Sequence, residues 1–149
     1  MGNLVIREAE YKDVEILGEL DVKCFDDPWS VESFKREIEE NSIAFYIVCE
    51  FDGKVVGYAG VWFILDEGHI TNVAVDPQYR NKGLGAKVVG TLIDFSRQEG
   101  IKSFTLEVRK SNIAAQNLYK KFGFKEEGVR PKYYENNGED ALIMWLTEE

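Results

Sequence analysis

A run of six residues, Arg80-Asn81-Lys82-Gly83-Leu84-Gly85, combines two cations with two closely spaced glycines. It stands between an alternating apolar stretch, HITNVAV, and a segment with apolar residues at helical spacing. The first N–H groups of a helix have no partner within the helix, and the helix dipole places partial positive charge there. A phosphate group fits such an end when side chains leave room, as Gly83 and Gly85 do. The run therefore predicts a site for a phosphate-bearing compound.

Three phosphate-binding patterns can be compared with this run. A Walker loop requires GxxxxGK followed by Ser or Thr, which the sequence lacks. A dinucleotide fingerprint requires GxGxxG after a first strand, whereas only GxG occurs here, in mid-chain. The third pattern places Arg or Gln three residues before Gly-x-Gly at a strand-to-helix junction, and Arg80, Gly83 and Gly85 match it. A glycine turn without a ligand has the same appearance, so other segments must decide.

The segments around this run predict an α/β fold. Apolar residues at helical spacing predict helices at 11–25, 28–41, 84–99 and 112–122, and Ser30 is the expected N-cap of the second. Strands are predicted at 3–9, 43–51, 54–65, 69–76, 103–109, 124–130 and 140–146. A tight turn at Asp52-Gly53 joins the second and third strands. The order βααβββαβαββ indicates a mixed, mostly antiparallel sheet flanked by about four helices.

Composition and charge restrict the function classes. The 149 residues are 44% hydrophobic and contain no repeat or linker, which predicts one domain over residues 1–149. No apolar run could span a membrane, and the first ten residues do not resemble a secretory signal, so we expect a cytoplasmic protein without membrane contact. The formal charge of −9 argues against nucleic-acid binding. Cys24 and Cys49 lack metal-ligand spacing and His69 is the only histidine, so neither a metal nor a disulfide is expected.

The segment that contains the glycine run and three further segments form a recognisable set. NVAVDPQYRNKGLG, LEVRKSNIAAQNLYKKFGF and YYENNGEDALIMWL occur in an order and at intervals that, with DDPWSVESF, resemble the GNAT (Gcn5-related) N-acetyltransferases. Within that family the sequence is similar to the RimI-type subgroup, which acetylates protein N-termini and whose type member modifies the N-terminal alanine of a small-subunit ribosomal protein. The resemblance implies an acetyl-CoA-dependent Nα-acetyltransferase that needs no metal and acts on a protein N-terminus, such as that of a ribosomal protein. We expect a monomer.

The resemblance also implies a set of acetyl-CoA-binding residues. In the family the glycine loop holds the pyrophosphate, and a bulge splays the strand that corresponds to NVAV and frees its N–H groups for the acetyl oxygen and the pantetheine amides. The residues that match the family's cofactor contacts are Val73, Ala74, Val75, Arg80, Asn81, Lys82, Gly83, Leu84, Gly85, Ala86, Asn112 and Tyr119. Two alternatives stay open: the NVAV strand could be fully paired, and Asn112 could also be a helix N-cap.

Glu107 and Tyr119 match the two catalytic positions of the family. The glutamate is assigned as the base, acting through water, and the tyrosine as the acid that protonates the thiolate of CoA. An α-amine with a pKa of about 7.7–8.0 needs only a modest base, and a phenol with a pKa of about 10 is a weak but sufficient acid. From position alone, Glu107 could instead be an exposed strand residue paired with Arg109 or Lys102. Tyr119 could pack in the core, which is compatible with the catalytic role.

Segments that flank the acceptor groove in this family supply the candidate substrate contacts. These contacts are Trp29, Tyr133, Tyr134, Glu139 and Asp140. Trp29 fits a structural anchor beside Pro28 better than a substrate contact, and KYYENN could be a β-hairpin with its turn at 136–138. His69 has no second imidazole and is expected to be solvated or at the core edge.

Two other functions compete with Nα-acetylation. A relative that acetylates lysine side chains or small amines would need more help to deprotonate its acceptor, because a lysine pKa is about 10.4. A non-catalytic CoA-binding module would not need a base and an acid, so the presence of both Glu107 and Tyr119 argues against it.

Overall fold

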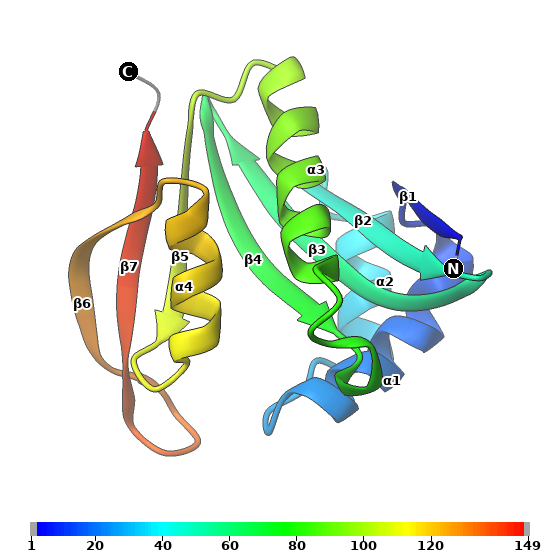
Figure 1. The fold of residues 1–149 in the computed structure, drawn as a ribbon, viewed down its shortest axis with the longest axis horizontal. Coiled ribbons are helices and arrows are strands. Elements are labelled where there is room, and N and C mark those ends of the chain that lie inside the picture. The colour runs from blue at the N-terminus through cyan, green and yellow to red at the C-terminus, as the bar shows by residue number, and fades with distance from the viewer. Residues whose placement is uncertain (1–2, 148–149) are drawn as a thin grey trace.

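A seven-stranded sheet runs through residues 3–147, the part of the chain that the computed structural model describes (Figure 1). The strands are β1 (Leu4–Glu8), β2 (Ala44–Phe51), β3 (Lys54–Ile64), β4 (Glu67–Val75), β5 (Ser103–Arg109), β6 (Lys125–Tyr134) and β7 (Glu139–Thr147). They lie in the order β1-β2-β3-β4-β5-β7-β6, and every neighbouring pair is antiparallel except β4 with β5. The sheet is mixed and mostly antiparallel, which confirms the predicted fold class.

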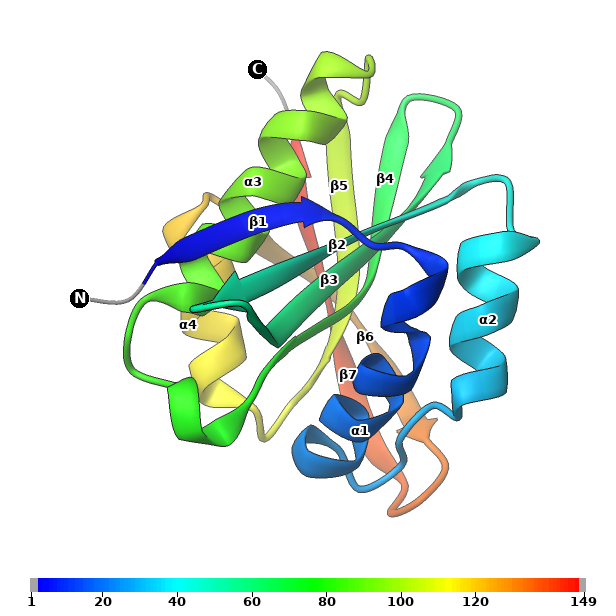
Figure 2. The same cartoon turned by 90° about the vertical axis from the view of Figure 1, so that its right-hand side faces the viewer.

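Helices lie on both faces of this sheet. They are α1 (Val14–Cys24), α2 (Val31–Glu39), α3 (Leu84–Gln98) and α4 (Ile113–Lys121). On one face α3 lies over β2, β3 and β4, and α4 lies over the β5 and β7 side (Figure 1). On the other face α1 and α2 pack only against the β2–β4 half (Figure 2). In the described part of the chain, that second face of β5 and β7 therefore has no helical cover.

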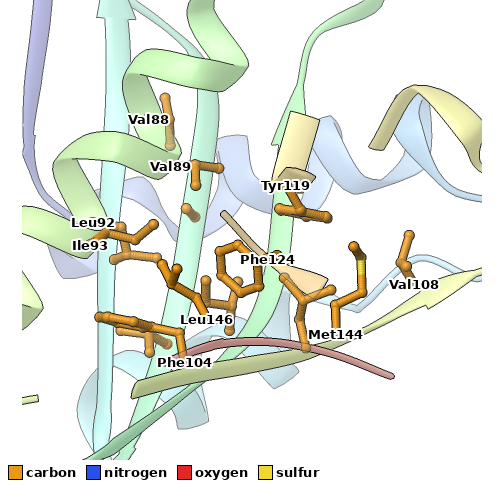
Figure 3. Packing of buried hydrophobic residues seen from close by; sticks show 14 of the residues in the cluster. Val88, Val89, Leu92, Ile93, Phe104, Val108, Tyr119, Phe124, Met144 and Leu146 are labelled. Carbon is orange, nitrogen blue, oxygen red and sulfur yellow. The ribbon is translucent and has the colours of Figure 1, made fainter. Parts of the chain in front are cut away.

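Two hydrophobic clusters fill the spaces between helices and sheet. The larger lies under α3 and α4, where Val88 and Leu92 of α3 pack towards Phe104 of β5 and Met144 of β7 (Figure 3). The smaller cluster lies under α1 and α2, and Phe34 forms its centre with an exposed fraction of 0%. Alternate residues of β5 and β7 are buried, as expected for strands with one face in the core.

The predicted element order is confirmed, and the differences lie at element ends. Ser30 caps α2, because its hydroxyl accepts a hydrogen bond from the N–H of Ser33 at 3.1 Å. The Asp52-Gly53 turn has the predicted positive φ angles, 53° and 83°. The helix expected at 11–25 begins as a short 3-10 turn before α1. None of the described helices has the length and apolar content that a membrane-spanning helix requires.

Strand β6 is longer than predicted. The strand was expected to end at residue 130, whereas β6 continues to Tyr134. A register irregularity between Arg130 and Tyr134 disturbs the alternation there, and Lys132 adopts a φ of 52°. Gly138 then donates to the carbonyl of Tyr134 at 2.8 Å, which closes the predicted hairpin turn.

Replacement of Phe34 by alanine tests the smaller cluster. The Phe34 ring lies 5.5 Å from the ring centres of both Trp29 and Tyr58, so its loss leaves a cavity. We expect Phe34→Ala to lower the free energy of unfolding by about 3–5 kcal/mol in urea denaturation. The control is Phe25→Ala, whose side chain is 39% exposed and whose loss should cost about 1 kcal/mol or less. Equal losses in the two variants would contradict this description of the core.

Candidate active site

The site is built around a gap between strands β4 and β5. The two strands pair only over Glu67–His69 with Ser103–Thr105, after which β4 stays with β3 and β5 stays with β7 (Figure 1). A register shift in the β3–β4 pair also leaves Thr71 without an opposite residue. The alternative of a fully paired NVAV strand is therefore wrong. The edge of Val73–Val75 that faces β5 has backbone groups without strand partners.

The glycine run forms the entry to α3, close to the carboxyl end of β4. Gly83 is the N-cap residue and has a φ of 78°, a conformation that favours glycine. A Cβ atom at this position would meet nothing within 4 Å, so the space in front of the helix is open. At Gly85 a Cβ atom would make only an ordinary contact with Leu118 at 3.5 Å. Packing within the protein therefore does not require glycine at 85.

Backbone donors point out of this helix end. The N–H of Lys87 donates to the carbonyl of Gly83 at 3.2 Å, so the N–H groups of Leu84, Gly85 and Ala86 have no acceptor within the helix. The Nε atom of Arg80 donates to the carbonyl of Val75 at 3.1 Å. The free donors and the helix dipole make this end suited to a pyrophosphate.

The last turn of α1 braces the same loop. Lys23 contacts the carboxylate of Asp76 at 3.2 Å, and Asp76 also accepts a hydrogen bond from the N–H of Gln78 at 2.9 Å. Burial raises the pKa of Asp76, but these two contacts outweigh it and hold the pKa below its ordinary value. The thiol of Cys24 donates to the carbonyl of Val75 at 3.3 Å. Helix α1, which lies on the opposite face of the sheet, thereby holds the loop between β4 and α3 in place.

Glu107 lies on β5 beside the gap, with its side chain only 11% exposed. One carboxylate oxygen, Oε1, lies 3.1 Å from Nε2 of His69 and accepts a hydrogen bond from the hydroxyl of Tyr133 at 3.3 Å. The hydrogen bond from His69 lowers the pKa of Glu107 below its ordinary value despite burial, so the group is a carboxylate at neutral pH. A carboxylate only accepts, so Nε2 of His69 carries the hydrogen.

The alternative of an exposed Glu107 paired with a nearby cation is wrong. Arg109 instead contacts the carboxylate of Glu139 at 3.2 Å. Among the described residues, Lys102 forms no ion pair with Glu107.

Tyr119 lies on α4 and is 8% exposed, with its ring 5.7 Å from that of Phe124. The expectation that its ring packs in the core is confirmed (Figure 3). Burial raises the pKa of Tyr119 well above its ordinary value, so the phenol keeps its proton. Its hydroxyl has no hydrogen bond within the described chain. Because no fully buried side-chain N or O atom there lacks a partner, the hydroxyl oxygen is not completely buried.

Asn112 is the N-cap of α4, since its Oδ1 accepts a hydrogen bond from the N–H of Ala115 at 3.1 Å. The capping role that the sequence left open is therefore present. The Nδ2 group makes no hydrogen bond to the described residues. A cap through Oδ1 and a ligand contact through Nδ2 are therefore compatible.

The β6–β7 hairpin holds four of the five candidate substrate residues. Hydrogen bonds from Ser111 and Arg109 lower the pKa of Glu139 to about 2, so this carboxylate ties the hairpin to the end of β5. Asp140 accepts a hydrogen bond from the N–H of Lys132 at 3.0 Å. Both acidic residues therefore brace the hairpin.

The two tyrosines of the hairpin lie closer to the gap. Tyr133 contacts Glu107, as described above. The Tyr134 ring lies 3.9 Å from the guanidinium of Arg109, and burial raises the pKa of Tyr134 to about 12. Tyr133 and Tyr134 lie edge to face, with ring centres 5.0 Å apart. The hairpin thus places the Tyr133 phenol in contact with Glu107 and the Tyr134 ring next to that of Tyr133.

Trp29 lies in the connection between α1 and α2. Its backbone N–H donates to Oδ2 of the buried Asp21 at 2.9 Å, and its ring packs on Phe34. The expectation that Trp29 is a structural anchor is confirmed. In the described residues, no hydrogen bond or ring contact joins Trp29 to Glu107.

A groove of about 340 Å³ lies on the uncovered sheet face beside Glu107. The residues that line it are Ile64, Glu67, His69, Thr105, Glu107, Arg130, Ile143 and Trp145. Sequence reasoning left His69 out of the site, yet it contacts Glu107 directly. The signal lay in the alternation of HITNVAV, which puts His69 and Ile70 on opposite faces. The alternation places His69 beside Glu107 only when the pairing of His69 with Thr105 is known, and the sequence alone does not show that pairing.

The groups at the site are those of an acid–base enzyme. Within residues 3–147, no three His, Cys, Asp or Glu side chains lie close enough together to hold a metal ion. A carboxylate and unpaired backbone groups lie at the gap instead, and a protonated phenol lies on α4. Such groups suit transfer of an acyl group.

Comparison with known proteins gives the family. The acetyltransferase (GNAT) family matches residues 14–124. A protein of Bacillus subtilis (strain 168) is 42% identical over 142 residues, which are 95% of this chain and 94% of that protein. The ribosomal protein bS18-alanine N-acetyltransferase of Escherichia coli (strain K12) is 35% identical over 143 residues, 95% of each chain.

A solved structure agrees with these relatives. The crystal structure of the ribosomal-protein-S18-alanine N-acetyltransferase from Escherichia coli matches this fold with a TM-score of 0.89 and 33% identity. The match covers 97% of this chain and 94% of that one. The matched family span includes the glycine run, Glu107 and Tyr119, and this chain belongs to the GNAT family of acetyltransferases.

Proposed function

We propose that this protein transfers the acetyl group of acetyl-CoA to the N-terminal α-amine of a ribosomal protein that begins with alanine. The observation that carries the proposal is the position of the Glu107 carboxylate beside the gap between β4 and β5, in contact with His69 and Tyr133. The ribosomal protein bS18-alanine N-acetyltransferase of Escherichia coli, similar to this chain in sequence at 35% identity and in structure with a TM-score of 0.89, supports the choice of acceptor.

The residues at the gap fit acetyl-CoA. The open space at Gly83 and the free N–H groups at the start of α3 suit its pyrophosphate, and the unpaired edge of Val73–Val75 suits its amides. The donors Arg80, Asn81 and Lys82 precede these groups, and Asn112 offers its Nδ2 group at the start of α4. Bound acetyl-CoA supplies the thioester that makes the acetyl group transferable.

Glu107 acts as the base, directly or through one water molecule. Its Oε1 is occupied by His69 and Tyr133, whereas Oε2 makes no hydrogen bond to the described residues and is available to accept a proton. An α-amine with a pKa of about 7.8 is about 30% neutral at pH 7.4, whereas a lysine with a pKa of about 10.4 is about 0.1% neutral. The lowered pKa of Glu107 makes it a weak base, which favours an α-amine over a lysine.

Tyr119 acts as the acid. Its phenol holds a proton at neutral pH because burial raises its pKa, and no described residue competes for that proton. A thiol has a pKa of about 8.5, below that of this phenol, so Tyr119 is a weak acid that supports the developing thiolate chiefly by donating a hydrogen bond. Packing against Phe124 keeps the ring in one position.

Turnover of a peptide panel tests the acceptor class. We expect release of free CoA thiol from acetyl-CoA with an alanine-starting peptide, and much slower release with the same peptide blocked at its α-amine but containing a lysine. The reverse order of rates would point to lysine acetylation. Binding of CoA with background thiol release for every peptide would identify a non-catalytic module.

Removal of the base or the acid should lower kcat without loss of cofactor binding. General acid–base groups contribute about 100-fold or more to rate, so Glu107→Gln and Tyr119→Phe should each reduce kcat by about that factor. The KM for acetyl-CoA should stay within about threefold, because both changes are nearly isosteric. Glu126→Gln, an exposed β6 variant, is the control and should be as active as the unmodified protein. Retention of more than half of kcat by Glu107→Gln would exclude the role of base.

The pH dependence should reflect the acceptor rather than Glu107. The value of kcat/KM for the peptide should rise with pH and level off above an acceptor pKa of about 7.7–8.0. Since the pKa of Glu107 is lowered chiefly by His69, His69→Ala should let burial raise it, so that a further loss of activity enters from the acidic side. Identical profiles for His69→Ala and the unmodified protein between pH 5 and pH 9 would show that His69 does not tune the carboxylate.

A further inference from the structure

A chain of three hydrogen-bonded side chains lies behind the gap, outside the groups used so far. Asp21 of α1 is 1% exposed, and it accepts hydrogen bonds from the Tyr58 hydroxyl at 2.5 Å and from the backbone N–H of Trp29 at 2.9 Å. The Tyr58 oxygen in turn accepts a hydrogen bond from Nδ2 of Asn72 at 3.1 Å. These hydrogen bonds link α1 through β3 to β4. They end at the Asn72 amide, whose Oδ1 has no hydrogen-bond partner among the described residues.

The hydrogen bonds of Asp21 and Tyr58 determine which way the Asn72 amide points. A phenol has one hydrogen, and that of Tyr58 is given to Asp21. The Tyr58 oxygen can then only accept from Asn72, so the NH₂ group of the amide must face Tyr58. The carbonyl oxygen, Oδ1, must point away from it. Since the described chain has no fully buried side-chain N or O atom without a partner, this Oδ1 lies at an accessible surface.

Asn72 and Glu107 face the same side of the sheet across the gap. Asn72 lies on the part of β4 that no longer pairs with β5, opposite Gly60 of β3. Its contact with Tyr58, a member of the cluster under α1 and α2, places its side chain on that face. Glu107 points to the same face, because its neighbours Leu106 and Val108 belong to the cluster under α3 and α4.

An acceptor amine must enter on the face that Asn72 and Glu107 share. The opposite face carries the larger core cluster together with α3 and α4, and the proposed cofactor contacts lie at the starts of these two helices (Figure 1). On the open face, Glu107 of β5 and Asn72 of β4 lie on the two sides of the gap. A neutral amine has N–H donors to offer the acceptor while its lone pair remains free.

We propose that Asn72 is an acceptor-binding residue whose Oδ1 accepts a hydrogen bond from the N-terminal amine of the substrate protein. This role rests on the proposed Nα-acetyltransferase function and adds a second contact to the amine. The hydrogen bond turns one N–H towards β4 and thereby directs the lone pair. Tyr58 and Asp21 are positioning residues, because they act on the amine only through the orientation of the Asn72 amide.

The KM for an alanine-starting peptide tests this assignment. Asn72→Leu keeps the side-chain volume and removes both polar atoms, so we expect the peptide KM to rise about five- to tenfold. The KM for acetyl-CoA should change by less than about twofold. Tyr58→Phe removes the oxygen that orients the amide and should raise the peptide KM by a smaller factor, about two- to threefold. Asn41→Leu is the matched control, since its amide binds Glu37 of α2 at 2.8 Å and it should leave both KM values unchanged.

The outcomes separate this inference from the function on which it rests. If the unmodified protein fails to acetylate the peptide, the proposed function is at fault. If it does acetylate the peptide and Asn72→Leu has the same peptide KM, Asn72 does not bind the acceptor. If Asn72→Leu melts too low to assay, Tyr58→Phe decides, and an unchanged peptide KM overturns the inference.

A change in the peptide identifies the group that Oδ1 contacts. An ester in place of the first amide removes the first peptide N–H and leaves the N-terminal amine. The ratio of the KM values for Asn72→Leu and the unmodified protein should then persist with the ester. Collapse of the ratio to one would place Oδ1 on the peptide N–H and overturn the contact with the amine.

Discussion

The short parallel contact between β4 and β5 is the constraint on which the rest of the site depends. A parallel pair that continued past His69 and Thr105 would satisfy the backbone of Val73–Val75 and close the gap. Because β4 turns away with β3 while β5 stays with β7, the edge of Val73–Val75 is left unpaired and Glu107 lies beside the gap on β5. The glycine run then follows directly from the end of β4, so the same divergence positions the entry to α3.

The protonation states of Glu107 and Tyr119 suit an α-amine acceptor better than a lysine acceptor. Glu107 is held ionised by His69 and Tyr133, and a carboxylate with a lowered pKa is a poor base for an ammonium group such as that of lysine. Tyr119 is held protonated by burial, with no contact in the described chain that would draw its proton away. The two environments move the two pKa values apart, which assigns the base and the acid without further groups.

How far the sequence predicts the site depends on how many positions along the chain separate the two residues of each contact. The N-caps Ser30 and Asn112 and the turn at Asp52-Gly53 are decided within a few residues, so local patterns suffice for them. The contact of His69 with Glu107 spans 38 positions and that of Tyr58 with Asp21 spans 37, and both depend on strand register and helix placement. No local pattern encodes that register. The roles of Glu107 and Tyr119 were therefore accessible only through family resemblance, while their neighbours required the fold.

The short pairing of β4 with β5 also separates the sheet into two units. One unit contains β1 to β4 with α1 to α3, the other contains β5 to β7 with α4, and in the sheet only Glu67–His69 holds them together beside the core contacts. The start of α3 belongs to one unit and the start of α4 to the other. A ligand that contacts both helix starts, as proposed for acetyl-CoA, bridges the two units, and its binding adds to the stability of the folded chain by mass action.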